Sequence, residues 1–214
     1  MSRERTRVKI CGIREAAHAR VAADAGADAI GLVFYRESPR YIAPSAAAAI
    51  ARSLPPFVMA VGLFVNESAE AIRAILGEVP LDLLQFQGDE SAEFCAQFGK
   101  AHVRAVRMEA GTDLVEYAGR FSRAKALLLD AHVAGQAGGT GKTFDWARMP
   151  RDFPLPLILS GGLTPQNVGN AVRGVRPWAV DVSSGVEASR GVKDPAKIVE
   201  FIRSVRLEDA GQPT

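Results

Sequence analysis

The stretch FVMAVGLFVNESAEAIRAILGE, residues 57–78, combines an apolar run with a helical pattern that follows it directly. Residues 57–65 are almost continuously apolar, which is typical of a strand in a parallel sheet that is buried on both faces. Asn66 is a residue type that helices favour at their start. Residues 67–76 then follow the apolar spacing of an amphipathic helix. The stretch therefore predicts one unit in which a strand is followed by a helix.

The same order of strand and helix recurs along the whole chain of 214 residues. The expected strands cover residues 7–11, 29–34, 57–65, 81–86, 102–108, 124–130, 155–161 and 178–184. The expected helices cover residues 14–25, 44–53, 67–76, 89–99, 112–121, 144–148, 165–173 and 195–205. Eight such units predict an α/β protein that folds as a single-domain (β/α)8 TIM barrel, with an open doubly wound sheet as the alternative. We expect the barrel to span residues 1–206 and residues 207–214 to form a disordered tail.

Composition and charge limit the classes of partner. The net charge is +2 and no basic stripe is present, so nucleic acid is not an expected partner. The longest charge-free apolar run, residues 55–65, is far shorter than the roughly 20 residues that span a bilayer. The charged start has no apolar stretch long enough for a signal peptide, and two cysteines do not make a disulfide framework. We expect a cytoplasmic protein with reduced thiols that does not bind membranes.

The glycine-rich stretch GQAGGTGKTFDW, residues 135–146, looks like a nucleotide-binding P-loop but differs from it in two ways. Gln136 stands where the P-loop pattern requires its first glycine. The stretch also follows its expected strand by about ten residues, whereas a P-loop follows its strand directly and leads into a long helix. Two further glycine stretches, residues 160–163 and 183–187, follow the seventh and eighth expected strands. In this kind of barrel these loops hold a phosphate group, so a phosphorylated substrate is expected and ATP is not.

The carboxyl ends of barrel strands form the active site, and this rule selects the candidate residues. Cys11 and Asp130 end the first and sixth expected strands, and Asp181 lies in the eighth. Gln85 and Gln87 close the fourth strand, and Arg36 and Arg40 follow the second. A cysteine at a strand end often only packs, and an arginine in a loop is often only solvated. An aspartate after a buried apolar run needs a partner or water, and the convergence of these residues on one rim favours a functional site.

The same rule excludes three other reactive residues. His18 falls within the first expected helix, and His102 begins the fifth expected strand at the opposite face. Cys95 lies between Phe94 and Phe98 on an expected helix, where a cysteine usually acts as a small buried apolar residue.

Taken together, the motifs resemble the phosphoribosylanthranilate isomerase family over nearly the whole chain. The resemblance rests on VKICGI (8–13), GADAIGLVF (26–34), SPRYI (38–42), VGLFVN (61–66), LLLD (127–130), GGTGKTFDW (138–146), LSGGLTPQNV (159–168) and VDVSSGVE (180–187). It implies an intramolecular aldose–ketose isomerase of tryptophan biosynthesis. The reaction is the Amadori rearrangement of N-(5'-phosphoribosyl)anthranilate to 1-(2-carboxyphenylamino)-1-deoxyribulose 5-phosphate.

The resemblance also implies roles for individual residues. Asp130 would be the general acid and Cys11 the general base, and Arg40 would pair with the anthranilate carboxylate. Asp181 matches an acidic position near the substrate. The phosphate would be held by Gly141, Gly161, Gly162, Ser183, Ser184 and Gly185. We expect no cofactor, no metal ion and a monomer or homodimer.

Two points follow for the chemistry of the site. The family often has histidine in the position of Gln87, which can form hydrogen bonds but cannot titrate, so we expect a role in positioning the substrate. An ordinary thiol is only a few per cent ionised at neutral pH, so the site is expected to favour the Cys11 thiolate. Two alternatives remain: another phosphosugar isomerase or epimerase, and a barrel that senses a phosphorylated metabolite without catalysis.

Overall fold

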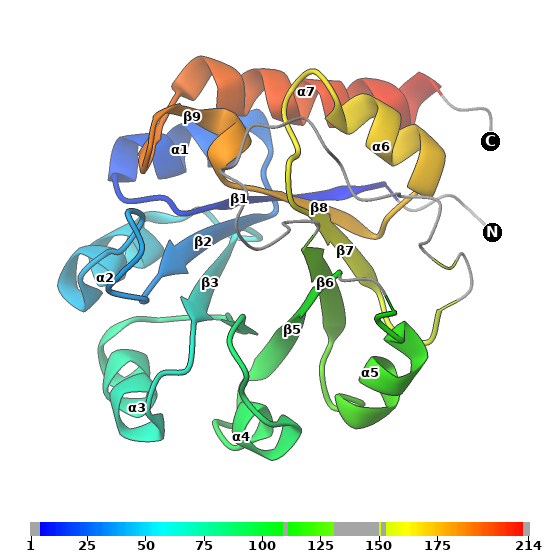
Figure 1. The fold of residues 1–214 in the computed structure, drawn as a ribbon. Helices are drawn as coiled ribbons and strands as arrows, with labels where there is room; N and C mark the ends of the chain where they lie inside the picture. Colours follow the sequence, from blue (N-terminus) through cyan, green and yellow to red (C-terminus); the bar gives the residue numbers. More distant parts are fainter. Residues whose placement is uncertain (1–4, 109–110, 131–149, 151–152, 212–214) are drawn as a thin grey trace.

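The computed structural model describes residues 5–108, 111–130, 150 and 153–211, and within them eight parallel strands form a closed barrel. The strands follow one another around the ring in sequence order (Figure 1). They are β1 (Arg7–Cys11), β2 (Ala29–Val33), β3 (Met59–Phe64), β4 (Leu83–Phe86), β5 (Ala101–Arg107), β6 (Ala126–Asp130), β7 (Leu157–Ser160) and β8 (Ala179–Val182). Because β1 pairs in parallel with both β2 and β8, the ring is closed, and the predicted TIM barrel is confirmed over the open sheet.

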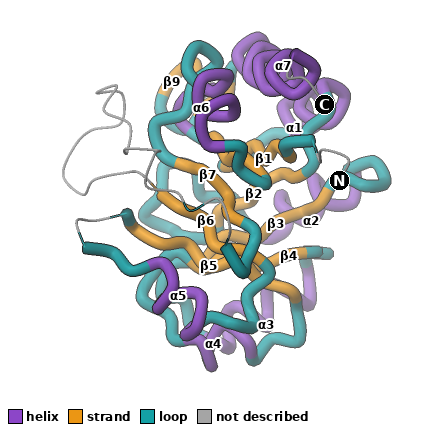
Figure 2. Tube along the Cα trace, turned by 90° about the vertical axis from the view of Figure 1, so that its right-hand side faces the viewer, coloured by secondary structure: helices purple, strands orange, loops and turns teal. Residues whose placement is uncertain are grey.

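Helices surround the strands on the outside of the ring (Figures 1 and 2). They are α1 (Ala16–Ala25), α2 (Pro44–Ser53), α3 (Ala69–Glu78), α4 (Ala92–Ala96), α5 (Leu114–Arg120), α6 (Val168–Val175) and α7 (Pro195–Gly211). The expected helix at 144–148 lies outside the described residues. No helix in the described ranges is long and apolar enough to cross a membrane.

The last helix extends beyond the predicted end of the barrel. α7 continues to Gly211, so residues 207–211 of the expected tail are helical, and residues 212–214 lie outside the described part. The side chains of Ile198, Phe201, Ile202 and Val205 on this helix are buried in the core. An aspartate near its end, Asp209, accepts hydrogen bonds from the backbone and side chain of Thr6. These contacts explain why the helix does not end at residue 206.

Some sequence signals predict the ends of helices correctly, whereas others place the start of a helix two residues too early. Pro44 is the first residue of α2, and Gly26 ends α1 in the left-handed conformation that glycine tolerates, as expected. The expected starts at Asn66 and Asp89 are wrong, because the side chains of Ser68 and Ser91 cap α3 and α4 instead. A serine oxygen accepts the free backbone N–H groups of the first turn, and this geometry decides where the helix begins.

The barrel has a packed interior below the carboxyl ends of its strands. Side chains alternate along each strand, so one set faces the helices and the other faces the interior. One buried cluster has members from β5 to β8, consisting of Val103, Ala105, Ala126, Leu128, Ile158 and Ala179. The members on β6 lie two and four positions before Asp130, and Ala179 on β8 lies two positions before Asp181, so the cluster lies below the rim.

A small hairpin after β8 was not predicted from the sequence. A short 3-10 helix (Ser184–Val186) leads into β9 (Glu187–Ser189), which pairs in antiparallel fashion with β10 (Val192–Lys193). Gly191 in the turn has a φ angle of 83°, which glycine adopts readily. The hairpin lies between the end of β8 and α7, at the active-site face of the barrel.

Candidate active site

The fold brings the predicted site residues to one rim. Cys11 and Asp130 are the last residues of β1 and β6, and Gln87 directly follows β4. Asp181 lies within β8, and Arg40 lies in the loop between β2 and α2. All these strands are parallel, so their carboxyl ends share one face of the barrel. The rim that the sequence predicted is therefore formed by elements from five different units.

Cys11 is held in a tight space between neighbouring strands. Its side chain packs in a small buried cluster with Val33 and Leu63, and only 5% of the residue is exposed. The neighbouring position on β2 is Gly31, and a Cβ atom there would lie only 2.7 Å from the Cys11 sulfur. Glycine at this position is therefore required for the thiol to occupy its place.

The expectation that the free site favours the Cys11 thiolate is wrong. Burial raises the pKa of the Cys11 thiol, and this effect outweighs the nearby ammonium groups of Lys9 and Lys193, which lower it. The carboxylate of Asp181 also raises this pKa. The sequence contained the charged residues but not the degree of burial, which decides the sign of the shift. The thiol is therefore protonated at neutral pH in the ligand-free protein.

Asp130 and Gln87 are linked by a chain of two hydrogen bonds. The Gln87 side-chain amide donates from Nε2 to Oδ2 of Asp130 at 3.1 Å. Its oxygen Oε1 accepts a hydrogen bond of 2.8 Å from Nε2 of Gln85, which is buried inside the barrel. Gln85 thus orients the Gln87 amide with its N–H group toward Asp130. The arrangement supports a positioning role for Gln87.

A buried ion pair lies beneath Cys11, and one of its two members was missed at the sequence level. Lys9 Nζ lies 2.8 Å from Oδ1 of Asp181, and both side chains are more than 90% buried. Ser160 Oγ donates to the other carboxylate oxygen at 3.3 Å. Lys9 is two residues before Cys11, so strand alternation places both on the interior face. A charged residue within the apolar strand pattern RVKIC could have indicated that Lys9 has a buried partner.

Arg40 pairs with a residue that the sequence did not single out. Its guanidinium donates from Nε and Nη2 to the two carboxylate oxygens of Glu187, at 2.6 and 3.0 Å. Lys193 of β10 also donates to Glu187, at 3.1 Å. Glu187 lies within the motif VDVSSGVE, but Lys193 lies in no recognised motif. The hairpin that carries Glu187 and Lys193 shows no periodic sequence pattern. Strand and helix periodicity could not have revealed this contact.

The glycine-rich loops after β7 and β8 lie against each other. A Cβ atom on Gly185 would come within 1.8 Å of the backbone oxygen of Leu163, so only glycine permits this approach. Gly161 and Gly162 have φ angles of 86° and 67°. The side chain of Ser183 donates to the Cys11 backbone oxygen and joins the loop to β1. Ser184 begins the short 3-10 helix, and the expected phosphate residue Gly141 lies outside the described residues.

The residues excluded from the site by sequence lie elsewhere. His18 is in α1, and Cys95 is buried in α4, where burial raises its pKa to about 11. His102 is buried beside the ring of Phe86, outside the barrel wall, and burial lowers its pKa. In the described ranges, His, Cys, Asp and Glu side chains form no group that could hold a metal ion.

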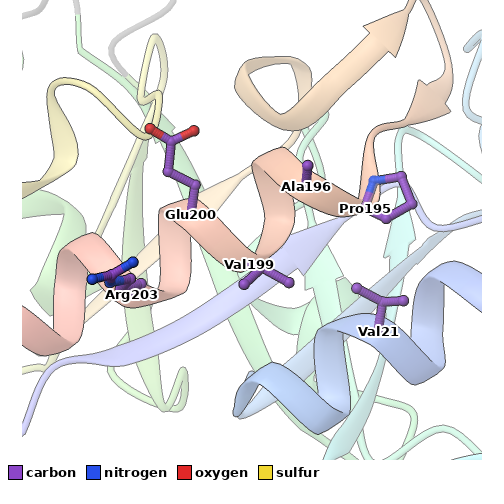
Figure 3. Close-up of a pocket in the computed structure, with 6 residues that line it drawn as sticks. All are labelled: Val21, Pro195, Ala196, Val199, Glu200 and Arg203. Atoms are coloured by element: carbon purple, nitrogen blue, oxygen red, sulfur yellow. The ribbon is translucent and has the colours of Figure 1, made fainter.

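Two surface hollows lie away from the rim. One hollow lies between α1 and α7 and is lined by Val21, Pro195, Ala196, Val199, Glu200 and Arg203 (Figure 3). A second hollow, lined in part by Arg7 and Trp178, lies at the amino-terminal ends of the strands. Neither includes a residue of the rim. The candidate site therefore rests on the residues at the strand ends and not on either of these hollows.

Comparison with known proteins agrees with this fold and identifies a family. The family model described as N-(5'phosphoribosyl)anthranilate (PRA) isomerase matches residues 8–204. The N-(5'-phosphoribosyl)anthranilate isomerase of Dechloromonas aromatica is 54% identical over 205 residues, which cover 96% of this chain and 98% of that protein. The protein of the same name from Nitrosococcus oceani is 55% identical over 201 residues, covering 94% of this chain and 98% of that protein.

Solved structures give the same result. The crystal structure of phosphoribosyl anthranilate isomerase from Thermotoga maritima superposes with a TM-score of 0.83 at 42% identity, covering 94% of this chain and 98% of that chain. A phosphoribosyl anthranilate isomerase in complex with reduced 1-(o-carboxyphenylamino)-1-deoxyribulose 5-phosphate gives a TM-score of 0.79 at 40% identity, with the same coverage. With a closed barrel, an acid and a thiol at its strand ends and a family match over almost its full length, this chain belongs to the N-(5'-phosphoribosyl)anthranilate isomerase family.

Proposed function

We propose that this protein catalyses the Amadori rearrangement of N-(5'-phosphoribosyl)anthranilate, with Asp130 as the general acid and Cys11 as the general base. The observation that carries these roles is the placement of one thiol and one carboxylate at the ends of β1 and β6. Because all the strands are parallel, β1 and β6 end at the same face of the barrel. The reaction needs one proton donor and one proton acceptor at different atoms of the same sugar.

The chemistry assigns one step to each group. Asp130 donates a proton to the furanose ring oxygen, the bond from this oxygen to C1' breaks, and the nitrogen lone pair forms a C1'–nitrogen double bond. The resulting iminium cation acidifies the hydrogen on C2'. Cys11 takes this proton, and the electrons form an enolamine. Addition of a proton at C1' and loss of the proton from the C2' hydroxyl then give the ketone, so substrate and product are isomers.

The iminium cation also explains how a thiol that is protonated in the free protein can act as a base. The pKa of the thiol is raised in the free protein because the group is buried. A positive charge that forms beside the thiol lowers that pKa, so the thiol loses its proton to solvent and the resulting thiolate accepts the C2' proton. The base therefore becomes effective at the step that requires it.

The remaining rim residues bind the two ends of the substrate. Arg40 receives the anthranilate carboxylate, because a planar guanidinium matches a planar carboxylate. The phosphate binds at Gly141, Gly161, Gly162 and the Ser183–Gly185 loop. Gln87 positions Asp130, and Asp181 acts near the substrate by fixing Lys9. We further propose that the protein works in the cytoplasm as a monomer or homodimer.

One experiment separates this function from its rivals. The purified protein is mixed with N-(5'-phosphoribosyl)anthranilate, and loss of the substrate's fluorescence is followed over time. Rapid loss that requires the protein supports the isomerase. Turnover of ribulose 5-phosphate instead would identify a phosphosugar epimerase, and binding without conversion of either compound would identify a sensor.

Gln87→His should be tolerated, with kcat/KM within about tenfold of the wild-type value, because a ring N–H can replace the amide donor to Asp130. Steady-state kinetics on the same substrate would test this. A gain well above that range would mean that a titrating group at position 87 takes part in proton transfer. The positioning role of Gln87 would then be wrong.

Arg40→Ala should raise KM much more than it lowers kcat. The anthranilate carboxylate does not change during the reaction, so its contact with Arg40 stabilises the ground state and the transition state almost equally. Separate measurement of the two constants would check this. An unchanged KM with a collapsed kcat would assign Arg40 to the chemical step instead.

A further inference from the structure

We infer that Glu187 is a positioning residue that presents Arg40 to the carboxylate of the substrate. Glu187 occupies one edge of the Arg40 guanidinium and leaves the other edge for the ligand. This inference rests on the proposed function and adds a residue to the recognition of the anthranilate group. The supporting observations concern the Glu187 carboxylate, the geometry of the fork and the packing of the arginine stem.

The Glu187 carboxylate is saturated with hydrogen-bond donors. Its oxygen Oε1 accepts from Arg40 Nε and from Lys193 Nζ, at 2.6 and 3.1 Å. Its oxygen Oε2 accepts from Arg40 Nη2 and from the backbone N–H of Gly191, at 3.0 and 3.2 Å. The side chain is only 5% exposed. A carboxylate held by four donors fixes the guanidinium bound to it.

The contact uses one particular edge of the arginine. Nε and Nη2 form the lateral edge of the guanidinium, and both are directed to Glu187. Within the described part of the chain, Arg40 Nη1 donates to no other residue, so the terminal fork of Nη1 and Nη2 remains available. Such a fork can bind a planar carboxylate through two parallel hydrogen bonds. The observed pairing is therefore compatible with simultaneous binding of an anionic ligand.

The stem of Arg40 is fixed by backbone contacts. A Cβ atom on Gly12, the residue after Cys11, would lie 2.7 Å from Cδ of Arg40, so the stem crosses this glycine closely. A Cβ atom on Gly191 would lie 2.4 Å from the backbone oxygen of Pro39. The β9–β10 turn thus packs against the residue before Arg40. Glu187 lies in the same hairpin and is therefore held beside the Arg40 guanidinium.

The local charge agrees with binding of an anion. Two basic side chains, Arg40 and Lys193, share the single carboxylate of Glu187. Burial alone would raise the pKa of Glu187, but the hydrogen bond from Arg40 and the charge of Lys193 outweigh it and hold the pKa below its usual value. Glu187 therefore remains ionised and keeps the two cations in place without fully neutralising them.

Lys193 connects this cluster to the base and the phosphate loop. Its ammonium group also donates to the backbone oxygen of Ser183 at 2.8 Å. The Ser183 hydroxyl in turn donates to the backbone oxygen of Cys11. Glu187 thus joins the loop after β2, which carries Arg40, to the loop after β8. A change at Glu187 should release Arg40 while leaving the backbone contacts at Cys11 intact.

The test compares two ligands with the variants Glu187→Gln, Arg40→Ala and the double variant. The first ligand is reduced 1-(o-carboxyphenylamino)-1-deoxyribulose 5-phosphate, and the second is the same compound without the carboxylate. Loss of a charge-assisted contact should weaken binding of the first ligand about tenfold or more in Glu187→Gln. Binding of the second should change less than about twofold. In the Arg40→Ala background, Glu187→Gln should have little further effect, because the two residues act as one unit.

Steady-state kinetics supply a second readout and Glu90→Gln a matched control. In Glu187→Gln, KM should rise while kcat stays within about threefold. Glu90 is also a buried glutamate paired with an arginine, Arg104, but this pair lies outside the barrel wall. Glu90→Gln should lower thermal stability without changing the ratio of the two ligand affinities.

Two outcomes would overturn the inference. Equal weakening of both ligands in Glu187→Gln, or full additivity with Arg40→Ala, would assign Glu187 a purely structural role. Failure of the proposed function itself gives a different result, because the wild-type protein would then bind neither ligand and would not convert the substrate. The two failures are therefore distinguishable in the same set of measurements.

Discussion

Asp130→Asn should lower kcat on N-(5'-phosphoribosyl)anthranilate by about 10²–10⁴-fold, which is the usual contribution of one positioned acid or base. Asparagine keeps the size of the side chain and can still accept the hydrogen bond from Gln87. It has no acidic proton to donate to the ring oxygen, so ring opening should stop at the first step. Substrate binding should change little, because neither the carboxylate nor the phosphate of the substrate is bound by Asp130.

Single-turnover measurements would check this expectation directly. With protein in excess, the rate of fluorescence loss reports the chemical steps without product release. Asp82→Asn is a matched control, because Asp82 accepts a backbone hydrogen bond from Ala60 at the opposite end of the barrel. The control should retain the wild-type rate. A rate for Asp130→Asn within a few-fold of wild type would remove Asp130 from the role of acid.

Cys11→Ser should produce a loss of similar size, about 10²–10⁴-fold in kcat. Serine nearly preserves the shape of cysteine beside Gly31, so the barrel should stay folded. Its hydroxyl remains protonated even when the iminium cation forms, and the C2' proton then has no acceptor. Thermal unfolding would verify the fold, and single-turnover kinetics would measure the loss. Near-wild-type turnover would require another base.

The pH dependence of thiol alkylation tests the same residue independently. Because burial raises the pKa of Cys11 in the free protein, inactivation by iodoacetamide should be slow at neutral pH and should accelerate only at a higher pH than for an ordinary thiol. Cys95→Ala removes the second buried thiol and serves as the background for this measurement. Fast alkylation at pH 7 would contradict the raised pKa.

The fold and the rim could be predicted because both depend on local patterns. Apolar runs such as ALLLD identify buried strands, and the position rule for barrels then places Asp130 and Cys11 at the active face. The fold and the positions of Cys11 and Asp130 could both be predicted from the order of strands and helices along the chain. The start of a helix was less predictable, since Ser68 competes with the nearby Asn66 and only the backbone geometry decides which side chain caps α3.

The contacts that the sequence did not reveal join distant segments. Arg40 and Glu187 are separated by 147 positions, and the second lies in a hairpin too short to give a periodic signal. The pKa of Cys11 was predicted in the wrong direction for a related reason. The sequence contains Lys9 two positions earlier, but it does not tell how far the thiol is removed from water. Burial depends on the whole barrel.

The most direct test of the account is one single-turnover experiment with wild-type protein and the two variants Cys11→Ser and Asp130→Asn. Each is mixed with N-(5'-phosphoribosyl)anthranilate, and formation of 1-(2-carboxyphenylamino)-1-deoxyribulose 5-phosphate is measured by chromatography. We predict that the wild-type protein forms this product at least about 100-fold faster than either variant. Absence of the product with wild-type protein, or comparable rates for all three proteins, would contradict the account.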